Sequence, residues 1–182
     1  MAKVYTRENL LEQVEKGISF DYLLFYGHKE SPDSEITDSC FSQWFPASFT
    51  VNGQVFPTTE HCMMAKKAIL FSDQEMLESI LACKTPKEAK AFGRKVRNFD
   101  PAVWEKHRSK IVVEANLAKF SQHQEMRNFL LASAPKILVE ASPRDCIWGI
   151  GMGKGNPDAL DPRKWRGKNL LGFALLEVRD LL

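Results

Sequence analysis

The segment from Phe56 to Leu70 contains a carboxylate and an amine at helical spacing. Pro57 and the two threonines that follow it predict a helix start, because a threonine hydroxyl can accept from the free N–H groups of a first turn. Seven residues separate Glu60 from Lys67, which is close to two turns at ~100° per residue, so both fall on one stripe of a largely apolar helix. A buried charge must pair or face a cavity. The residues leave two interpretations open: a structural ion pair or solvated edge, or a site in which carboxylate and amine act together.

A second informative segment runs from Pro143 to Lys168 and shows little periodicity. Its glycines, at 149, 151, 153 and 155, do not form the dinucleotide fingerprint, because the third position of that motif is occupied by Lys154. Glycines at alternate positions let backbone N–H groups approach an anion, and several cations accompany them: Lys154, Arg163, Lys164, Arg166 and Lys168. The segment is either an anion-binding loop or a mobile solvated loop. Trp148 could pack a flat ring or simply anchor the loop.

The composition narrows the class of protein. The 182 residues are 44% hydrophobic, which is enough for a real core, and the net charge of +2 argues against a protein that coats DNA. The chain has no apolar run of about 18 residues, and its first residues lack the apolar centre of a signal peptide. The cysteines and histidines show no ligand spacing. We therefore expect a cytoplasmic protein with reduced thiols, no metal and no cofactor.

Local signals predict an α+β fold that is mostly helical. Thr6 would cap a helix over residues 6–16, residues 22–26 and 137–141 read as strands, and Asn52-Gly53 predicts a tight hairpin. Further helices are indicated by start signals at Ser72/Glu75, Thr85/Glu88, Asp100/Pro101, Ser121/Gln124 and Asn169. No βαβ alternation is visible. We expect a single domain in which about six helices pack a small sheet and the hairpin.

An ordered set of short motifs makes the chain similar to the NADAR family. The matching motifs are Phe25-Tyr26-Gly27, Phe45-Pro46-Ala47-Ser48-Phe49, Pro57 through Ala68, Ala89-Lys90 with Gly93-Arg94, Lys119-Phe120, Leu138 through Ala141, Asp145 with Trp148-Gly149, and Gly167 through Gly172 with Glu177-Val178-Arg179. The resemblance runs from about residue 22 to the C-terminus. It predicts a NADAR domain over residues 22–182, preceded by an N-terminal extension over residues 1–21.

The resemblance implies an N-glycosidase that breaks a ribosyl C–N bond. Family members act on phosphoribosyl-aminopyrimidine intermediates of riboflavin biosynthesis, and others remove ADP-ribose from guanine in nucleic acids. A fixed carboxylate would stabilise the positive charge that builds on the sugar. The implied catalytic residues are Glu60, Lys67 and Asp145, and the implied substrate-binding residues are Phe25, Tyr26, Gly27, Trp44, Arg94, Trp148, Gly149 and Asn169. Lys67 is an electrostatic partner or an amine that forms a Schiff base, and Asn169 is also a candidate helix cap.

Three other functions remain open at this point. A nucleic-acid ADP-ribosyl hydrolase is the rival enzyme, and a non-catalytic ADP-ribose or nucleotide-binding module would need the same loop and aromatics without Glu60. An RNA-binding module would need a continuous basic face, but acidic residues are interspersed through the chain. The favoured partner is a small phosphoribosyl or ADP-ribosyl substrate, with nucleic acid only as a modified substrate and no membrane. No oligomeric state is predicted.

Overall fold

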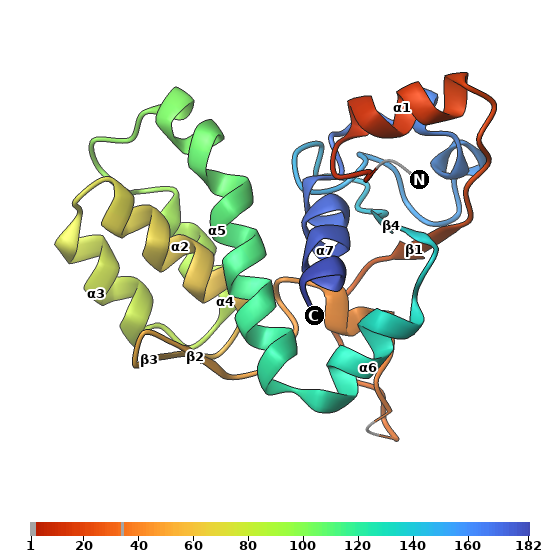
Figure 1. Cartoon of the computed structure of the whole chain (residues 1–182). Helices are drawn as coiled ribbons and strands as arrows, with labels where there is room; N and C mark the ends of the chain where they lie inside the picture. Colours follow the sequence, from red (N-terminus) through yellow and green to blue (C-terminus); the bar gives the residue numbers. More distant parts are fainter. Residues whose placement is uncertain (1–2, 34) are drawn as a thin grey trace. The chain divides into compact units, whose positions relative to one another are not determined.

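The computed structural model describes residues 3–33 and 35–182, which form two compact units (Figure 1). The first unit joins residues 1–42 to residues 125–182, and the second comprises residues 43–124. Both combine helices with a pair of short strands. The expectation of a mostly helical α+β fold is therefore confirmed. The boundary expected between residues 21 and 22 stays a prediction.

A two-stranded parallel sheet lies in the first unit. Strand β1 (Tyr22–Phe25) pairs with β4 (Ile137–Glu140), so that Tyr22 lies opposite Ile137 and Phe25 opposite Glu140. The first three residues of β4 are buried, and helix α7 (Leu170–Leu181) packs against this strand. The two predicted strands thus do form the small sheet.

The N-terminal segment of the first unit folds as its capping signals predict. Helix α1 (Arg7–Glu15) begins after Thr6, whose hydroxyl accepts from the N–H of Asn9 at 3.1 Å. Leu10 is completely buried, and the Tyr5 hydroxyl donates to Asp180 of α7 at 2.6 Å. Contacts of Tyr5 and Leu10 therefore hold the described part of this segment, from residue 3 onward, in the unit.

The remaining elements of the first unit are short. They are η1 (Asp38–Phe41), α6 (Gln124–Ala132), η2 (Pro157–Leu160) and η3 (Pro162–Lys164). The ring of Phe41 lies 5.5 Å from that of Phe25 and 5.4 Å from that of Phe129. These aromatic contacts fix η1 and α6 around β1.

The second unit contains the hairpin and four helices. Strands β2 (Phe49–Val51) and β3 (Gln54–Phe56) are antiparallel and are joined by Asn52 and Gly53, which both have positive φ. The chain then enters α2 (Thr59–Leu70), which contacts α3 (Gln74–Ala82), α4 (Pro86–Gly93) and α5 (Pro101–Gln122). Helix α2 is therefore the central helix of this unit. Among the residues that the structure describes, no helix is long and apolar enough to cross a membrane.

Two of the predicted helix starts are wrong. The side chain that caps α3 is Asp73, which accepts from Met76 N–H, while Ser72 has a left-handed backbone with φ of 55°. Ser121 does not start a helix, because α5 continues through it to Gln122. At α3 the neighbouring Asp73 is the cap, and α6 begins at Gln124, after α5 has passed through Ser121.

Candidate functional site

The first turn of α2 is fixed to the residue that begins the second unit. The backbone carbonyl of Gln43 accepts from the Glu60 N–H at 2.9 Å and from the Thr59 hydroxyl at 3.0 Å. Thr58 is the N-cap, and its hydroxyl accepts from the N–H of His61 at 3.4 Å. The N–H groups of Glu60 and His61 lie in the first turn, where a helix offers them no backbone acceptor, and these bonds supply one. They hold the backbone of Glu60 in one place.

Glu60 is a carboxylate in the first turn of a buried helix. Its exposed fraction is 2%, and that of the neighbouring His61 is 1%. The positive end of the helix dipole favours a negative charge at this position. Burial lowers the pKa of His61, whose Nδ1 lies 2.8 Å from the Thr58 hydroxyl, so this imidazole is neutral at pH 7. The arrangement offers one fixed carboxyl group, with a neutral ring beside it.

Lys67, at the other end of α2, has partners other than Glu60. Its ammonium donates to the carbonyl oxygen of Gly93 at 2.7 Å and lies 4.1 Å from the centre of the Phe99 ring and 5.5 Å from that of Trp104. Burial lowers the pKa of this amine. The expected stripe exists, but the structural ion pair between Glu60 and Lys67 does not form.

The adjacent lysine has a different environment. Lys66 forms an ion pair with Glu114 of α5, with Nζ and Oε2 separated by 2.6 Å. This contact joins α2 to α5 within the second unit. The different partners of Lys66 and Lys67 agree with the expectation that the two lysines differ in function. That difference in function stays a prediction.

Two predicted substrate-binding residues also belong to the second unit. Trp44 is half-buried, and the ammonium of Lys90 lies 5.8 Å from its ring centre. Arg94 is exposed at the C-cap of α4. Both side chains have some access to solvent, as contact with a ligand requires.

The sequence interpretation overlooked Lys119 of α5. This side chain is completely buried, with its ammonium 5.0 Å from the ring centre of Phe120 and 5.7 Å from that of Phe45. The signal was present, because Lys119 follows Ile111 and Ala115 at intervals of four on the buried stripe of that helix. A lysine on a buried stripe is unusual, so Lys119 joins Glu60 as a candidate.

In the first unit, Asp145 shapes the start of the glycine-rich segment. Its Oδ1 accepts from the N–H groups of Ile147 at 2.9 Å and Trp148 at 2.8 Å. Such a turn fixes the local backbone through the aspartate side chain. Trp148 is half-buried on this turn. Asp145 thus positions Trp148, and its catalytic role stays a prediction.

Gly149 and Asn169 lie against the free edge of β4. A Cβ atom on Gly149 would lie 2.8 Å from the carbonyl oxygen of Glu140, so only glycine fits there without a shift. Asn169 is completely buried, with φ of 54°; it accepts from the Glu140 N–H and donates to the Leu138 carbonyl, both at 2.9 Å. It occupies the N-cap position of α7 without a side-chain capping bond. Its amide instead takes the place of a peptide group from a further strand.

The three remaining predicted residues follow one another at the end of β1. Phe25 is completely buried against Phe41, which gives it a role in packing. Tyr26 is 50% exposed, and Gly27 has φ of 97°. Of the three, Tyr26 has the side chain that a ligand could reach.

The segment 143–168 is packed rather than mobile. Ile150 N–H donates to the Glu140 carbonyl, and the N–H groups of Arg166 and Gly167 donate to the Ile150 carbonyl. Ile150, Met152, Ala159 and Trp165 are buried. The solvated-loop interpretation is therefore disfavoured.

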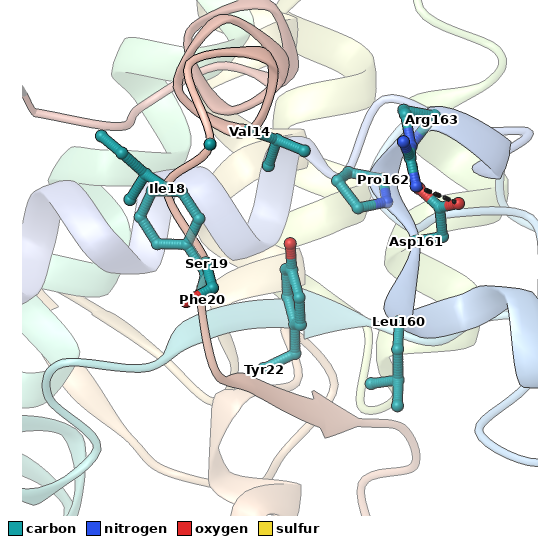
Figure 2. Close-up of a pocket in the computed structure, with 10 residues that line it drawn as sticks. Val14, Ile18, Ser19, Phe20, Tyr22, Leu160, Asp161, Pro162 and Arg163 are labelled. Carbon is teal, nitrogen blue, oxygen red and sulfur yellow. Dashed lines mark hydrogen bonds and ion pairs between the residues drawn. The ribbon is translucent and has the colours of Figure 1, made fainter.

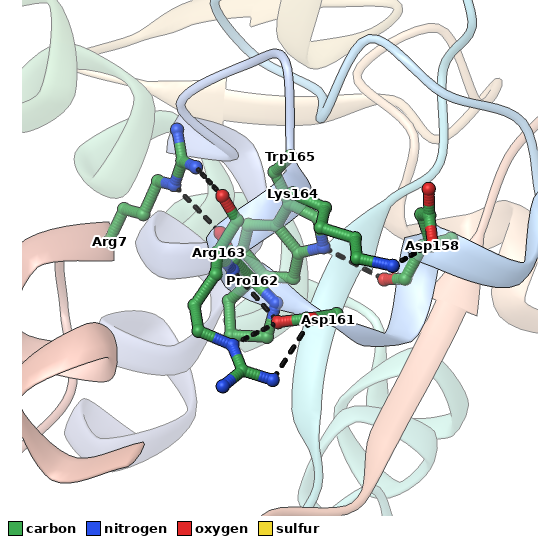
Figure 3. Close-up of polar contacts among 8 residues, drawn as sticks. Arg7, Asp158, Asp161, Pro162, Arg163, Lys164 and Trp165 are labelled. Atoms are coloured by element: carbon green, nitrogen blue, oxygen red, sulfur yellow. Dashed lines mark hydrogen bonds and ion pairs between the residues drawn. The ribbon is translucent and has the colours of Figure 1, made fainter. Parts of the chain in front are cut away.

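Carboxylates pair with three of the cations in this segment. Lys154 pairs with Asp38, Arg163 with Asp161, and Lys164 with Asp158. Figure 3 shows the last two pairs and the guanidinium of Arg7, which donates to the backbone carbonyls of Pro162 and Arg163. The positive charge available to an anion is smaller than the residue types suggest.

The cysteines carry no sign of a bound metal or a disulfide. Cys40, Cys62, Cys83 and Cys146 are all free thiols. Burial raises the pKa of Cys62 to about 12, so this thiol is inert at neutral pH. In residues 3–33 and 35–182, no group of three or more His, Cys, Asp or Glu side chains is placed to hold a metal ion.

Comparison with known proteins identifies the family. A model of the NADAR domain matches residues 24–182. The N-glycosidase R617 of Acanthamoeba polyphaga mimivirus is 41% identical over 164 residues, covering 87% of this chain and 95% of the relative. The N-glycosidase YbiA of Escherichia coli (strain K12) is 36% identical over 142 residues, covering 78% and 80%. The NMR structure of E. coli YbiA aligns with a TM-score of 0.71 and 30% identity, over 90% of this chain and 86% of that one. The chain described here belongs to the NADAR family.

Proposed function

We propose that this protein hydrolyses, in the cytoplasm, the ribosyl C–N bond of a phosphoribosyl-aminopyrimidine intermediate of riboflavin biosynthesis. The observation that carries the proposal is the fixed carboxylate of Glu60, 2% exposed in the first turn of α2. The names of the relatives, R617 and YbiA, support the reaction class, because both are called N-glycosidases.

The chemistry requires one anion near the anomeric carbon. Breaking the C–N bond builds positive charge on the ribose, as in glycoside hydrolysis. Glu60 is proposed to stabilise that charge or to activate the attacking water. Its backbone is held by Gln43, so little reorganisation is needed when the charge appears. The neutral His61 adds no competing positive charge.

Lys67 is proposed to act through its charge. Its contacts with the Gly93 carbonyl and the Phe99 ring favour an ammonium over a neutral amine, although burial lowers its pKa. A Schiff base would require the neutral amine. Lys119 is an additional candidate for the cationic partner, because it is the more deeply buried of the two lysines.

The first unit, taken by itself, offers side chains that are proposed to recognise a flat base. Trp148 offers a half-exposed ring that could stack on a flat base, and Asp145 holds the turn on which it lies. Tyr26 is proposed as a further contact, whereas Asn169 and Phe25 would act by holding β4 and β1 in place.

The charge pattern favours a small substrate over a nucleic acid. A polymer is usually met by a broad surface of unpaired cations. Here the net charge is +2, and Lys154, Arg163 and Lys164 each pair with a carboxylate. This observation ranks the phosphoribosyl-aminopyrimidine above ADP-ribosylated guanine in nucleic acid.

A direct competition tests the ranking. The purified protein is given the phosphoribosyl-aminopyrimidine and an ADP-ribosylated guanine oligonucleotide at equal concentration, and mass spectrometry follows ribose 5-phosphate and ADP-ribose. We expect ribose 5-phosphate to appear faster. Faster release of ADP-ribose would reverse the ranking, and release of neither product would contradict the reaction class.

A further inference from the structure

An open cavity of about 360 Å³ lies in the first unit, and none of the residues proposed for hydrolysis or recognition lines it (Figure 2). Val14 at the end of α1 and residues 17–20 that follow the helix form one wall, and residues 160–163 form the other. Tyr22 of β1 lies between the two walls. A second hollow of about 560 Å³ shares Phe20, Tyr22 and Leu160 with it. Small-ligand pockets have volumes of roughly 300–1,000 Å³, so the cavity has the size of a binding site.

The wall before Tyr22 is specific to this chain's N-terminal segment. The NADAR match begins at residue 24, so residues 14–20 lie outside it. The wall is nevertheless anchored, because Leu10 of α1 is completely buried and Arg7 donates to the carbonyls of Pro162 at 3.0 Å and Arg163 at 3.3 Å. These bonds join one wall of the cavity to the other (Figure 3). The cavity is thus a built feature of the unit.

The lining is mostly apolar and includes the hydroxyl groups of Ser19 and Tyr22. Val14, Ile18, Phe20, Leu160 and Pro162 supply apolar surface, and Leu160 is 56% exposed. Figure 2 shows the hydroxyl of Tyr22 directed into the space between Val14 and Pro162. This hydroxyl forms no hydrogen bond with any residue that the structure describes. Burial, and then the nearby Asp161 carboxylate, raise the pKa of Tyr22, so the hydroxyl is a donor at neutral pH.

The charges at the edge of the cavity neutralise each other. Asp161 accepts from the Arg163 guanidinium at 2.8 Å and 3.0 Å, one bond to each carboxylate oxygen. Among the residues that line this cavity, an ionised ligand would therefore find no unpaired counter-charge, and it would lose part of its hydration. Asp21 and Lys136 line only the adjoining hollow. A neutral ring would instead bury apolar area against Phe20 and Tyr22 and accept one hydrogen bond.

We propose that this cavity is an accessory binding site for a small uncharged heteroaromatic ring, of nucleobase size, that accepts a hydrogen bond from Tyr22. The site is independent of the proposed hydrolysis, which involves none of its lining residues. The N-terminal segment would thereby add a ligand site to the NADAR domain.

The test uses adenine and nicotinamide as neutral probes and benzoate as a charged probe of similar size. Titrations of the ¹⁵N-labelled full chain are followed by NMR, with attention to the amides of residues 14–22 and 160–163. We expect the neutral probes to shift these amides with a Kd of roughly 0.1–10 mM, as a small ring with one hydrogen bond allows. Benzoate should bind at least several-fold more weakly.

Matched variants separate specific binding from surface adsorption. Tyr22→Phe keeps the ring and removes the hydroxyl, so it should weaken binding of both neutral probes by about fivefold. Tyr26→Phe makes the same change on a tyrosine that does not line the cavity and should leave the Kd unchanged. Turnover of the phosphoribosyl substrate should be the same in Tyr22→Phe as in wild type. The proposal is overturned if these amides do not shift at 10 mM probe, or if the two variants bind equally well.

Discussion

Replacing Asn169 with alanine should lower the free energy of unfolding substantially. The change leaves the Glu140 N–H and the Leu138 carbonyl without the amide that each contacts at 2.9 Å. A buried backbone group left unsatisfied costs about 1–3 kcal/mol, so the two together cost about 2–6 kcal/mol. That is a large part of the ~5–15 kcal/mol by which a typical domain is stable. Urea denaturation followed by circular dichroism measures the change.

The control for this prediction is Asn98→Ala. Asn98 has φ of 55°, nearly the same as Asn169, but it is exposed and its side chain makes no hydrogen bond with the described residues. Asn98→Ala therefore measures the cost of placing alanine in the left-handed region, about 1–2 kcal/mol, without the loss of two buried hydrogen bonds. If Asn169→Ala is no more destabilising than Asn98→Ala, the assignment of Asn169 to the edge of β4 is refuted.

Three further changes test separate parts of the molecule. Lys67→Ala should reduce turnover severely, whereas Lys66→Ala should leave turnover near wild type, because Lys66 pairs with a carboxylate of α5. Equal effects of the two substitutions in steady-state assays would contradict this division. Borohydride trapping that leaves no adduct on Lys67 would support an electrostatic role for this residue. Asp73→Asn should lower the free energy of unfolding at pH 7, and its difference from wild type should shrink in acid. Hydrogen bonds from Arg97 hold the pKa of the Asp73 carboxyl well below its usual range. The resulting stabilisation is therefore complete above the unfolded pKa of about 4 and is lost as the pH falls through the folded pKa. A deficit that is independent of pH down to the acid transition would argue against the pair. Arg7→Ala should speed amide hydrogen exchange in residues 157–165, because it removes the hydrogen bonds to two carbonyls of that segment. Unchanged exchange would mean that contacts within the segment are enough to keep it ordered.

Short-range signals predicted much of the fold. The Thr6 cap and the Asn52-Gly53 turn depend on neighbours within a few residues, and the structure has both. Where two residues compete for one cap, as Ser72 and Asp73 do, local pattern is not enough: Asp73 also accepts from Arg97, 24 residues away. Long-range contacts therefore decided what the local signal could not.

The candidate site was only partly predictable for the same reason. Helical spacing correctly placed Glu60 on a buried helix, but it could not reveal that the Gly93 carbonyl and the Phe99 ring surround Lys67. The charges of the glycine-rich segment looked available for an anion: Asp38, the partner of Lys154, lies far away in the sequence. Asp161 and Asp158 are close to their partners Arg163 and Lys164 in the sequence, but residue types alone do not show which neighbours pair. Lys119 was named only as part of a family motif, although its spacing from Ile111 and Ala115 places it on the buried stripe of α5.

The most direct test of the central claim is the rate of ribose 5-phosphate release by Glu60→Gln. The substitution keeps the shape of a side chain that is 2% exposed and removes its charge. Loss of one preorganised electrostatic group predicts a fall in kcat of roughly a hundredfold or more, with circular dichroism unchanged. Glu78→Gln, the same change at an exposed position of α3, should keep the wild-type rate. A folded Glu60→Gln protein that turns over as fast as Glu78→Gln would contradict the role given to this carboxylate.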